Sequence, residues 1–267
     1  MNDDRIFTIA VDEQQVEATL VMPRTLIPGV LFIHGWGVDR DTYLNRAREL
    51  AALGCICLLF DMRGHAATVE QRDAVTREDN LADVVAAYDC LAAHPLVDPA
   101  AIAVVGSSYG GYLAAVLTGV RPVRWLGMRV PALYKDEDWL VPKQDLRDHG
   151  LEAFRQRPVA ADRNRALGAC AAFGGDVLLV KSGKDEVIPD PVTRNYLAAL
   201  TGVRSLTYRV IDGADHALSE QHWQQYYASL LLGWINEMIV AAREDGAVPE
   251  SRIGLPPTLR REPDNPA

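Results

Sequence analysis

Residues 101–118, AIAVVGSSYGGYLAAVLT, constrain the fold more than any other stretch of this chain. A β-rich run (residues 101–105) stops at Gly106-Ser107-Ser108-Tyr109-Gly110, and a helical pattern rich in alanine and leucine follows (109–118). A tight strand-to-helix turn strains its central residue, and the flanking glycines let neighbouring backbone pass close by. The pattern predicts an exposed Ser108 hydroxyl above the positive end of the helix dipole. A plain Ser/Gly connection between the two elements is the alternative.

Length and charge narrow the class of protein. A chain of 267 residues is long enough for one large α/β domain with insertions and a substantial core. The net charge of −9 argues against sequence-independent binding to nucleic acid. The acidic, polar start of the chain does not resemble a signal peptide, and the longest apolar tract (229–242) contains Asn236 and Glu237 and is too short to span a bilayer. We therefore expect a soluble, cytoplasmic protein with no membrane or nucleic-acid partner; its oligomeric state, a homodimer included, stays open.

No motif for a cofactor or a metal ion stands out. The cysteines lack metal-ligand spacing with histidine, and neither H-E-x-x-H nor Cys-x-x-Cys occurs. The glycine-rich turn has neither G-x-x-x-x-G-K-[ST] nor G-x-G-x-x-G spacing. We expect chemistry that uses no cofactor and no metal.

Strand and helix patterns alternate along most of the chain. Apolar runs of the kind found in buried parallel strands occur at residues 30–33, 55–60, 101–105, 123–130, 176–181 and 205–211. Helical patterns occur at residues 41–53, 78–93, 109–118, 191–200 and 219–243. Thr76 followed by Asp79 predicts a capping box at the start of the second helix. This alternation predicts a mostly parallel sheet with helices on both faces.

Three segments depart from this alternation. Residues 5–22 predict an antiparallel hairpin at the edge of the sheet. Residues 132–175 are too long for an ordinary connection, so we expect an inserted lid containing one or two helices. Residues 244–267 are rich in proline and charge and predict a loosely tethered tail, which leaves residues 1–243 as a single domain.

The polar residues of interest follow predicted strands. Ligands bind outside the carboxyl ends of the strands of a parallel sheet. His34-Gly35-Trp36, Asp61, Ser108, Asp185 and His216 each fall at such an end. We therefore expect them to converge in space although they are far apart in the sequence.

These residues resemble the α/β-hydrolase superfamily over roughly residues 5–243. Ser108, Asp185 and His216 occur in the family's order of nucleophile, acid and histidine. Gly183-Lys184-Asp185 is similar to the family's acid loop and Ala214-Asp215-His216 to its histidine loop. The segment 61–65, DMRGH, is similar to a structural D-x-R-G-x-G turn, although Ala66 replaces the last glycine. The chain resembles compact bacterial esterases and relatives of the dienelactone-hydrolase and acyl-peptidase branches, although dienelactone hydrolases use cysteine where this chain has serine.

The resemblance implies a serine hydrolase without a cofactor. His216 would take the proton of Ser108, Asp185 would orient His216, and the backbone N–H groups of Trp36 and Tyr109 would form the oxyanion hole. The reaction expected is cleavage of a small or medium carboxylic ester through an acyl-enzyme. A thioesterase, an acyl- or aminopeptidase and an acyltransferase would share these residues, and a non-catalytic ligand-binding protein on the same scaffold is the alternative of another class.

Several assignments have competitors. Glu186 or Asp212 could replace Asp185 as the acid, and His222 competes with His216 but is expected on a helix surface. Asp215 is expected to order its loop, His34 to bond within the oxyanion loop and His65 to be structural; the Trp36 ring either lines the acyl pocket or covers the sheet edge. The insertion supplies candidates for substrate contact, or else it is a solvated lid: Tyr134, Lys135, Asp136, Asp138 and Trp139.

Overall fold

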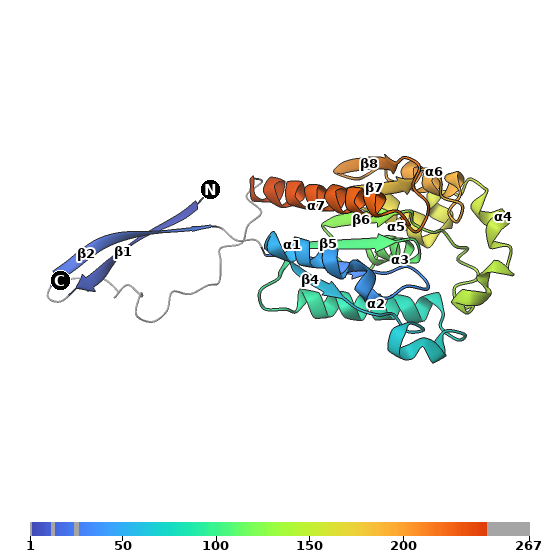
Figure 1. Ribbon diagram of the computed structural model, residues 1–267, viewed down its shortest axis with the longest axis horizontal. Helices are drawn as coiled ribbons and strands as arrows, with labels where there is room; N and C mark the ends of the chain where they lie inside the picture. Colours follow the sequence, from blue (N-terminus) through green and yellow to red (C-terminus); the bar gives the residue numbers. More distant parts are fainter. Residues whose placement is uncertain (1, 12–13, 24–26, 245–267) are drawn as a thin grey trace. The chain divides into compact units, whose positions relative to one another are not determined.

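The computed structural model describes residues 2–11, 14–23 and 27–244, with side chains described from residue 27 to residue 242. It divides into two compact units, Ile27–Met238 and a second unit that contains the N-terminal hairpin (Figure 1). The predicted tail, residues 244–267, lies outside the described residues apart from the last residue of the final helix.

The hairpin consists of β1 (Asn2–Val11) and β2 (Gln14–Pro23). The two strands are antiparallel, with Asn2 opposite Pro23 and Val11 opposite Gln14. They form a two-stranded sheet with each other, which confirms the predicted hairpin. Its place at the edge of the central sheet stays a prediction. Alternating hydrophobicity specifies a strand but does not specify its further partners.

The central sheet of the described chain has six strands, all parallel, in the order β4-β3-β5-β6-β7-β8. The strands are β3 (Pro28–Ile33), β4 (Ile56–Leu59), β5 (Asp98–Ser107), β6 (Trp125–Arg129), β7 (Asp176–Ser182) and β8 (Ser205–Ile211). The strand order reverses between β3 and β5, because β4 lies on one side of β3 and all later strands lie on the other. The carboxyl ends of β3 and β5 therefore flank the place where sheets of this type bind ligands.

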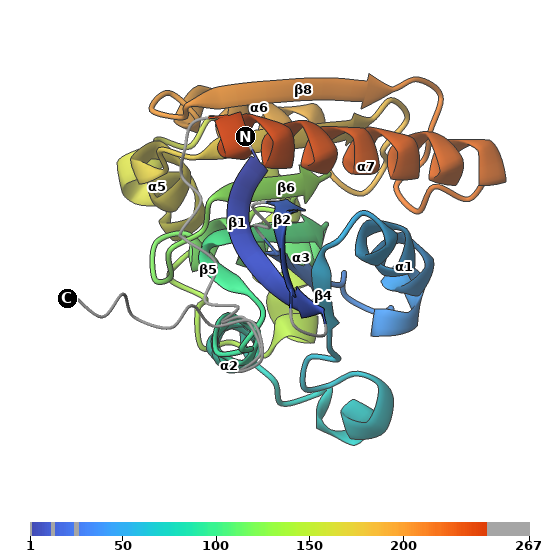
Figure 2. The same cartoon turned by 90° about the vertical axis from the view of Figure 1, so that its left-hand side faces the viewer.

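Helices cover both faces of this sheet, as predicted. They are η1 (Arg40–Tyr43), α1 (Leu44–Ala52), η2 (Ala66–Gln71), α2 (Arg77–Ala92), α3 (Tyr109–Leu117), α6 (Asp190–Ala199) and α7 (Gln221–Glu244). Figure 2 shows α1 on one side of the sheet and α2 on the other. The largest buried cluster joins apolar side chains of α2, α3 and α6 to one face of the strands. The capping box of α2 is present, with the Thr76 side chain accepting from the Asp79 N–H and Asp79 bonding back to the Thr76 N–H.

Only part of the segment between β6 and β7 forms the inserted lid that the sequence predicts over residues 132–175. It contains η3 (Lys143–Arg147), α4 (Leu151–Arg155), η4 (Ala161–Arg163) and α5 (Arg165–Ala172). Leu167 and Cys170 of α5 are fully buried in the same cluster as α3 and α6. The helix α5 thus belongs to the layer that covers the sheet, and only the part before it extends beyond the regular architecture. None of the helices in the described ranges is long and apolar enough to cross a membrane.

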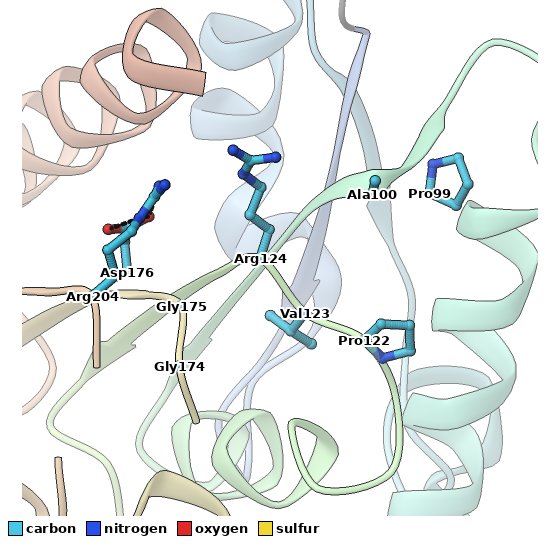
Figure 3. A pocket seen from close by; sticks show the side chains of 9 residues that line it. All are labelled: Pro99, Ala100, Pro122, Val123, Arg124, Gly174, Gly175, Asp176 and Arg204. Atoms are coloured by element: carbon cyan, nitrogen blue, oxygen red, sulfur yellow. Dashed lines mark hydrogen bonds and ion pairs between the residues drawn. The ribbon is translucent and has the colours of Figure 1, made fainter. Parts of the chain in front are cut away.

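A cleft of about 370 Å³ lies at the amino ends of β6 and β7 (Figure 3). Its floor includes the ion pair between Asp176 and Arg204, and Ser205 donates a hydrogen bond of 2.7 Å from Oγ to the Asp176 carboxylate. These contacts hold the starts of β7 and β8 together. The cleft is at the opposite end of the strands from Ser108, which follows the carboxyl end of β5.

Candidate active site

Ser108 occupies a strained turn between β5 and α3. Its backbone has φ 54° and ψ −115°, a region that residues other than glycine rarely adopt. A Cβ on Gly106 would collide with the backbone of Gly110, and a Cβ on Gly110 would collide with the carbonyl of Ile33. The two glycines of the pentapeptide are therefore required by close backbone approach, and the turn places the half-buried Ser108 at the carboxyl edge of the sheet.

Ser108, His216 and Asp185 meet at this edge, although they are far apart in the sequence. The distance from His216 Nε2 to Ser108 Oγ is 3.1 Å. The distance from His216 Nδ1 to Asp185 Oδ2 is 2.8 Å. A carboxylate only accepts hydrogen bonds, so Nδ1 carries the imidazole proton and Nε2 is left free to accept from the serine hydroxyl.

Asp185 is held as an ionised, buried carboxylate. Its side chain is 1% exposed, and Oδ1 accepts hydrogen bonds of 2.8 Å from the N–H groups of Val187 and Ile188. Burial alone would raise the pKa of Asp185, but the bond from His216 and the two N–H groups outweigh it and lower the pKa. The competing acids Glu186 and Asp212 are both exposed, and neither bonds to His216.

The loop that carries His216 is braced from β6. The guanidinium of Arg129, itself 8% exposed, donates a hydrogen bond of 2.8 Å to the carbonyl of His216 and another of 3.3 Å to Ser107 Oγ. Asp215 accepts bonds from the N–H and the hydroxyl of Ser219 and so orders the loop, as expected. His222 is exposed, also as expected.

Two buried histidines shape the loop after β3. His34 Nε2 accepts a bond of 3.0 Å from the Met62 N–H, so its Nδ1–H donates to the Gly35 carbonyl at 2.8 Å. His65 Nε2 accepts from the Gly37 N–H at 3.2 Å, and its ring lies edge-on to that of His34. Burial lowers the pKa of His34, and burial together with the neighbouring His34 lowers the pKa of His65 to about 4. Both rings are therefore neutral at pH 7 and act as acceptors for backbone N–H groups.

This loop lies against the serine turn. A Cβ on Gly35 would be 3.5 Å from the carbonyl oxygen of Ser107 and 3.7 Å from Cβ of Ser108. The Trp36 ring packs edge-on against the Tyr109 ring with centroids 5.7 Å apart. Tyr109 is the first residue of α3, where backbone N–H groups have no partner within the helix. The loop and the helix start thus approach Ser108 from two sides.

A cavity of about 490 Å³ opens beside Ser108 and His216. We call it the active-site cavity; its lining also includes Trp36, Arg72, Tyr109, Tyr134, Lys143, Gln144, Leu146, Arg147, Leu151, Arg155, Val187 and Ile188. Trp36 therefore lines the cavity, and Tyr134 does so although its side chain is buried.

The other residues of the insertion proposed to contact substrate lie elsewhere. Trp139 is 6% exposed and is stacked between the guanidinium groups of Arg77 and Arg165, so it is part of the core and not of the cavity wall. Lys135 donates a hydrogen bond to the His149 carbonyl, and Asp138 bonds to the His149 ring. These contacts link the two ends of the segment 135–149. Asp136 is turned toward the start of α5, where it accepts from the Arg165 N–H. None of these four side chains lines the active-site cavity, and their contact with substrate stays a prediction.

Comparison with known proteins identifies the family. Residues 30–229 match the model of the Alpha/beta hydrolase family. The chain belongs to the alpha/beta hydrolase family. That span contains most of β3, all of β4 to β8, the serine turn and all three of Ser108, Asp185 and His216.

Individual relatives of this chain are distant. An uncharacterized protein of Mycobacterium tuberculosis is 29% identical over 195 residues, 71% of this chain and 63% of that protein. The pimeloyl-[acyl-carrier protein] methyl ester esterase of Chromobacterium violaceum is 34% identical over 116 residues, 42% of this chain and 41% of that esterase. The matches thus span less than two thirds of the length of these relatives. Among solved structures, that of a metagenome-derived lipolytic enzyme superposes with a TM-score of 0.60 at 19% identity, covering 79% of this chain and 94% of that one, which shows a shared fold.

The sequence alone did not indicate the basic residues of the cavity or the Arg129 bonds that hold the histidine loop. Lys143, Arg147 and Arg155 belong to a segment without clear periodicity, so nothing local indicated where their side chains lie. Arg129 did leave a signal, because it is a charged residue at the carboxyl end of an otherwise apolar strand. Within the described ranges, no cluster of His, Cys, Asp and Glu has the geometry to hold a metal ion.

Proposed function

We propose that this hydrolase cleaves carboxylic esters through an acyl-enzyme formed on Ser108. The observation that carries the proposal is the continuous hydrogen-bonded series Ser108 Oγ, His216, Asp185, with distances of 3.1 Å and 2.8 Å, opening into a cavity of about 490 Å³. The name of the Chromobacterium violaceum relative, an esterase, favours an ester over an amide or a thioester.

The first half of the reaction follows from the tautomer of His216. Ser108 Oγ attacks the ester carbonyl carbon while its proton passes to His216 Nε2, which accepts because Nδ1–H is bonded to Asp185. The carbonyl oxygen becomes an oxyanion, and the N–H groups of Trp36 and Tyr109 are the donors proposed to hold it. The imidazolium then gives its proton to the departing alkoxide, which leaves as an alcohol and leaves the acyl group on Ser108.

The second half repeats these steps with water. His216 Nε2 takes a proton from a water molecule as the hydroxide oxygen bonds to the acyl carbon. The Ser108 oxygen then leaves and regains its proton from His216, which releases the carboxylic acid. Asp185 keeps its negative charge throughout and stabilises the imidazolium formed in each half.

Steady-state hydrolysis of p-nitrophenyl esters from acetate to palmitate tests the proposal. Wild type is compared with Ser108→Ala, alongside an aminoacyl-p-nitroanilide and an acyl-CoA. We expect turnover of the short and medium esters, with kcat lowered by about 10⁴ or more in the variant. Preference for the anilide or the acyl-CoA would replace the ester assignment with a peptidase or thioesterase, and full activity of a folded Ser108→Ala would overturn the mechanism.

A further inference from the structure

The active-site cavity is basic, although the chain as a whole carries a net charge of −9. Four of the side chains that line it are cationic: Arg72, Lys143, Arg147 and Arg155. Its lining contains no Asp or Glu. The Asp185 carboxylate does not line the cavity; its side chain is 1% exposed and bonds to His216. A substrate in the cavity therefore meets positive charge.

These four cations have no partner of opposite charge. In the part of the chain that the structure describes, no carboxylate lies within 4.0 Å of any of them. Arg155 uses its Nε–H to bind the Leu133 carbonyl at 3.1 Å, which positions the group without neutralising it. Other arginines of the fold do find carboxylates, as Arg63 does with Asp83.

Aromatic rings hold the cations in place. The Lys143 ammonium lies 4.7 Å from the centroid of the Trp36 ring, 5.1 Å from that of Tyr109 and 5.3 Å from that of Tyr134. The Arg72 guanidinium also lies near Trp36, 5.1 Å from the centroid of its ring. Cation–π contact fixes where a charge lies but leaves the charge uncompensated. Half-buried cations without counter-ions are costly, so this arrangement favours an anion that supplies the missing charge.

Tyr134 reports on the potential in the cavity. Burial alone would raise the pKa of this phenol, but the Lys143 ammonium and the Arg155 and Arg77 guanidinium groups lower the pKa below its usual value. Arg77 lies behind the cavity wall, is fully buried and, in the described structure, bonds to Tyr112 and the Lys135 carbonyl and to no carboxylate. Lys143 and Arg155 themselves line the cavity, so two of the cations that lower this pKa face a bound substrate.

We propose that the ester taken by this site carries an anionic group, a carboxylate or a phosphate, which binds Lys143, Arg147 and Arg155. The inference rests on the proposed ester hydrolysis and adds the substrate class. The lining also contains four apolar side chains: Leu146, Leu151, Val187 and Ile188. The substrate that fits is an ester with a short apolar chain between the scissile carbonyl and the anion, or with the anion on the leaving group.

Matched pairs of esters separate charge from size. The p-nitrophenyl monoester of adipic acid is compared with its methyl ester, which has the same chain without the charge. A p-nitrophenyl acetate bearing a ring carboxylate is compared with plain p-nitrophenyl acetate, which tests the leaving-group side. We expect kcat/KM of the anionic member to exceed that of its neutral partner by about tenfold or more in one of the pairs. The ratio should fall as salt rises from about 0.01 M to about 1 M.

Variants assign the effect to the named residues. Lys143→Met and Arg147→Gln should each lower the anionic-to-neutral ratio by about tenfold. Arg147 is exposed and its side chain donates no hydrogen bond among the described residues, so its variant should fold. Arg157→Gln is the control, because Arg157 is an exposed arginine of the same segment that does not line the cavity, and it should leave the ratio unchanged.

The outcomes distinguish this inference from the proposed function. If wild type hydrolyses the neutral esters but shows a ratio of one or less in both pairs, the anionic substrate is refuted and ester hydrolysis stands. If the ratio of kcat/KM for the anionic ester to that for its neutral partner stays high in both Lys143→Met and Arg147→Gln, these two residues do not bind the anion. Calorimetry with Ser108→Ala measures binding without turnover: if this variant binds the adipate monoester over its methyl ester while wild type cleaves neither, anion recognition stands and ester hydrolysis fails.

Discussion

Replacing Asp185 by asparagine should move the imidazole proton of His216 from Nδ1 to Nε2 while leaving the fold intact. Asp185 Oδ1 accepts two backbone N–H groups, from Val187 and Ile188, at 2.8 Å. In Asp185→Asn the amide oxygen must keep that place, because an NH₂ group there would face two donors. The NH₂ group is therefore directed at His216 Nδ1, which must become an acceptor. His216 Nε2 then carries the proton and donates toward Ser108 Oγ.

A histidine in this tautomer cannot take the proton of the serine. The same substitution in a serine protease triad lowers kcat by about 10⁴, which corresponds to about 5 kcal/mol of transition-state stabilisation. We expect a loss of that size here, with KM changed little, because Asp185 does not line the cavity. The free energy of unfolding should fall by only about 1 kcal/mol, because the two backbone bonds survive.

The assay is kcat for p-nitrophenyl butyrate together with urea unfolding of the same preparation. Glu186→Gln is the matched control: Glu186 is the exposed neighbour of Asp185 and should tolerate the change with kcat unaltered. A folded Asp185→Asn that retains kcat within tenfold of wild type would refute the reasoning, and a large loss in Glu186→Gln would transfer the role of the acid to that residue.

Three further changes test the scaffold. Thr76→Ala removes the capping box of α2 and should lower the free energy of unfolding by about 1 kcal/mol in urea titrations, and no loss would mean that the box contributes nothing. Gly110→Ala puts a Cβ against the Ile33 carbonyl and should lower the free energy of unfolding by about 3 kcal/mol. Gly233→Ala is the control at a helical position where an added Cβ has open space, and it should leave the free energy of unfolding unchanged or raise it by up to about 1 kcal/mol. Similar effects of the two substitutions would contradict the close approach at Gly110. The pKa of His65 is about 4 in the folded chain against 6.5 in the unfolded chain, so the unfolded chain binds the proton more tightly. The free energy of unfolding should therefore fall by about 3 kcal/mol between pH 6.5 and pH 4. His65→Gln should reduce this dependence on pH, and an unchanged dependence would contradict the assignment.

Local patterns explain why much of the fold could be predicted. The helix cap at Thr76, the glycine-flanked turn at Ser108 and the proline at the start of α6 each act through neighbours in sequence, and the structure has all three features. The convergence of Ser108, Asp185 and His216 at one edge could also be anticipated. It follows from the rule that the carboxyl ends of parallel strands meet on one side of a sheet.

Tertiary contacts explain what could not be predicted. Trp139 is a candidate for substrate contact from the sequence, but its ring is buried beside the guanidinium groups of Arg165 and of Arg77, which is 62 positions earlier in the sequence. Nothing near Lys143 in the sequence indicates that it lines the cavity. Its position depends on contact with three aromatic rings that come from separate parts of the chain. The partner of a hairpin strand and the burial of a lid side chain depend on what the remainder of the chain places beside them.

The most direct test of a nucleophilic Ser108 is intact-mass spectrometry after reaction with a fluorophosphonate, followed by peptide mapping. The account predicts one adduct per chain, located on Ser108, formed rapidly in wild type, slowly in His216→Ala and not at all in Ser108→Ala. Wild type that stays unlabelled, or an adduct mapped to another residue, would contradict the claim that Ser108 is activated by His216.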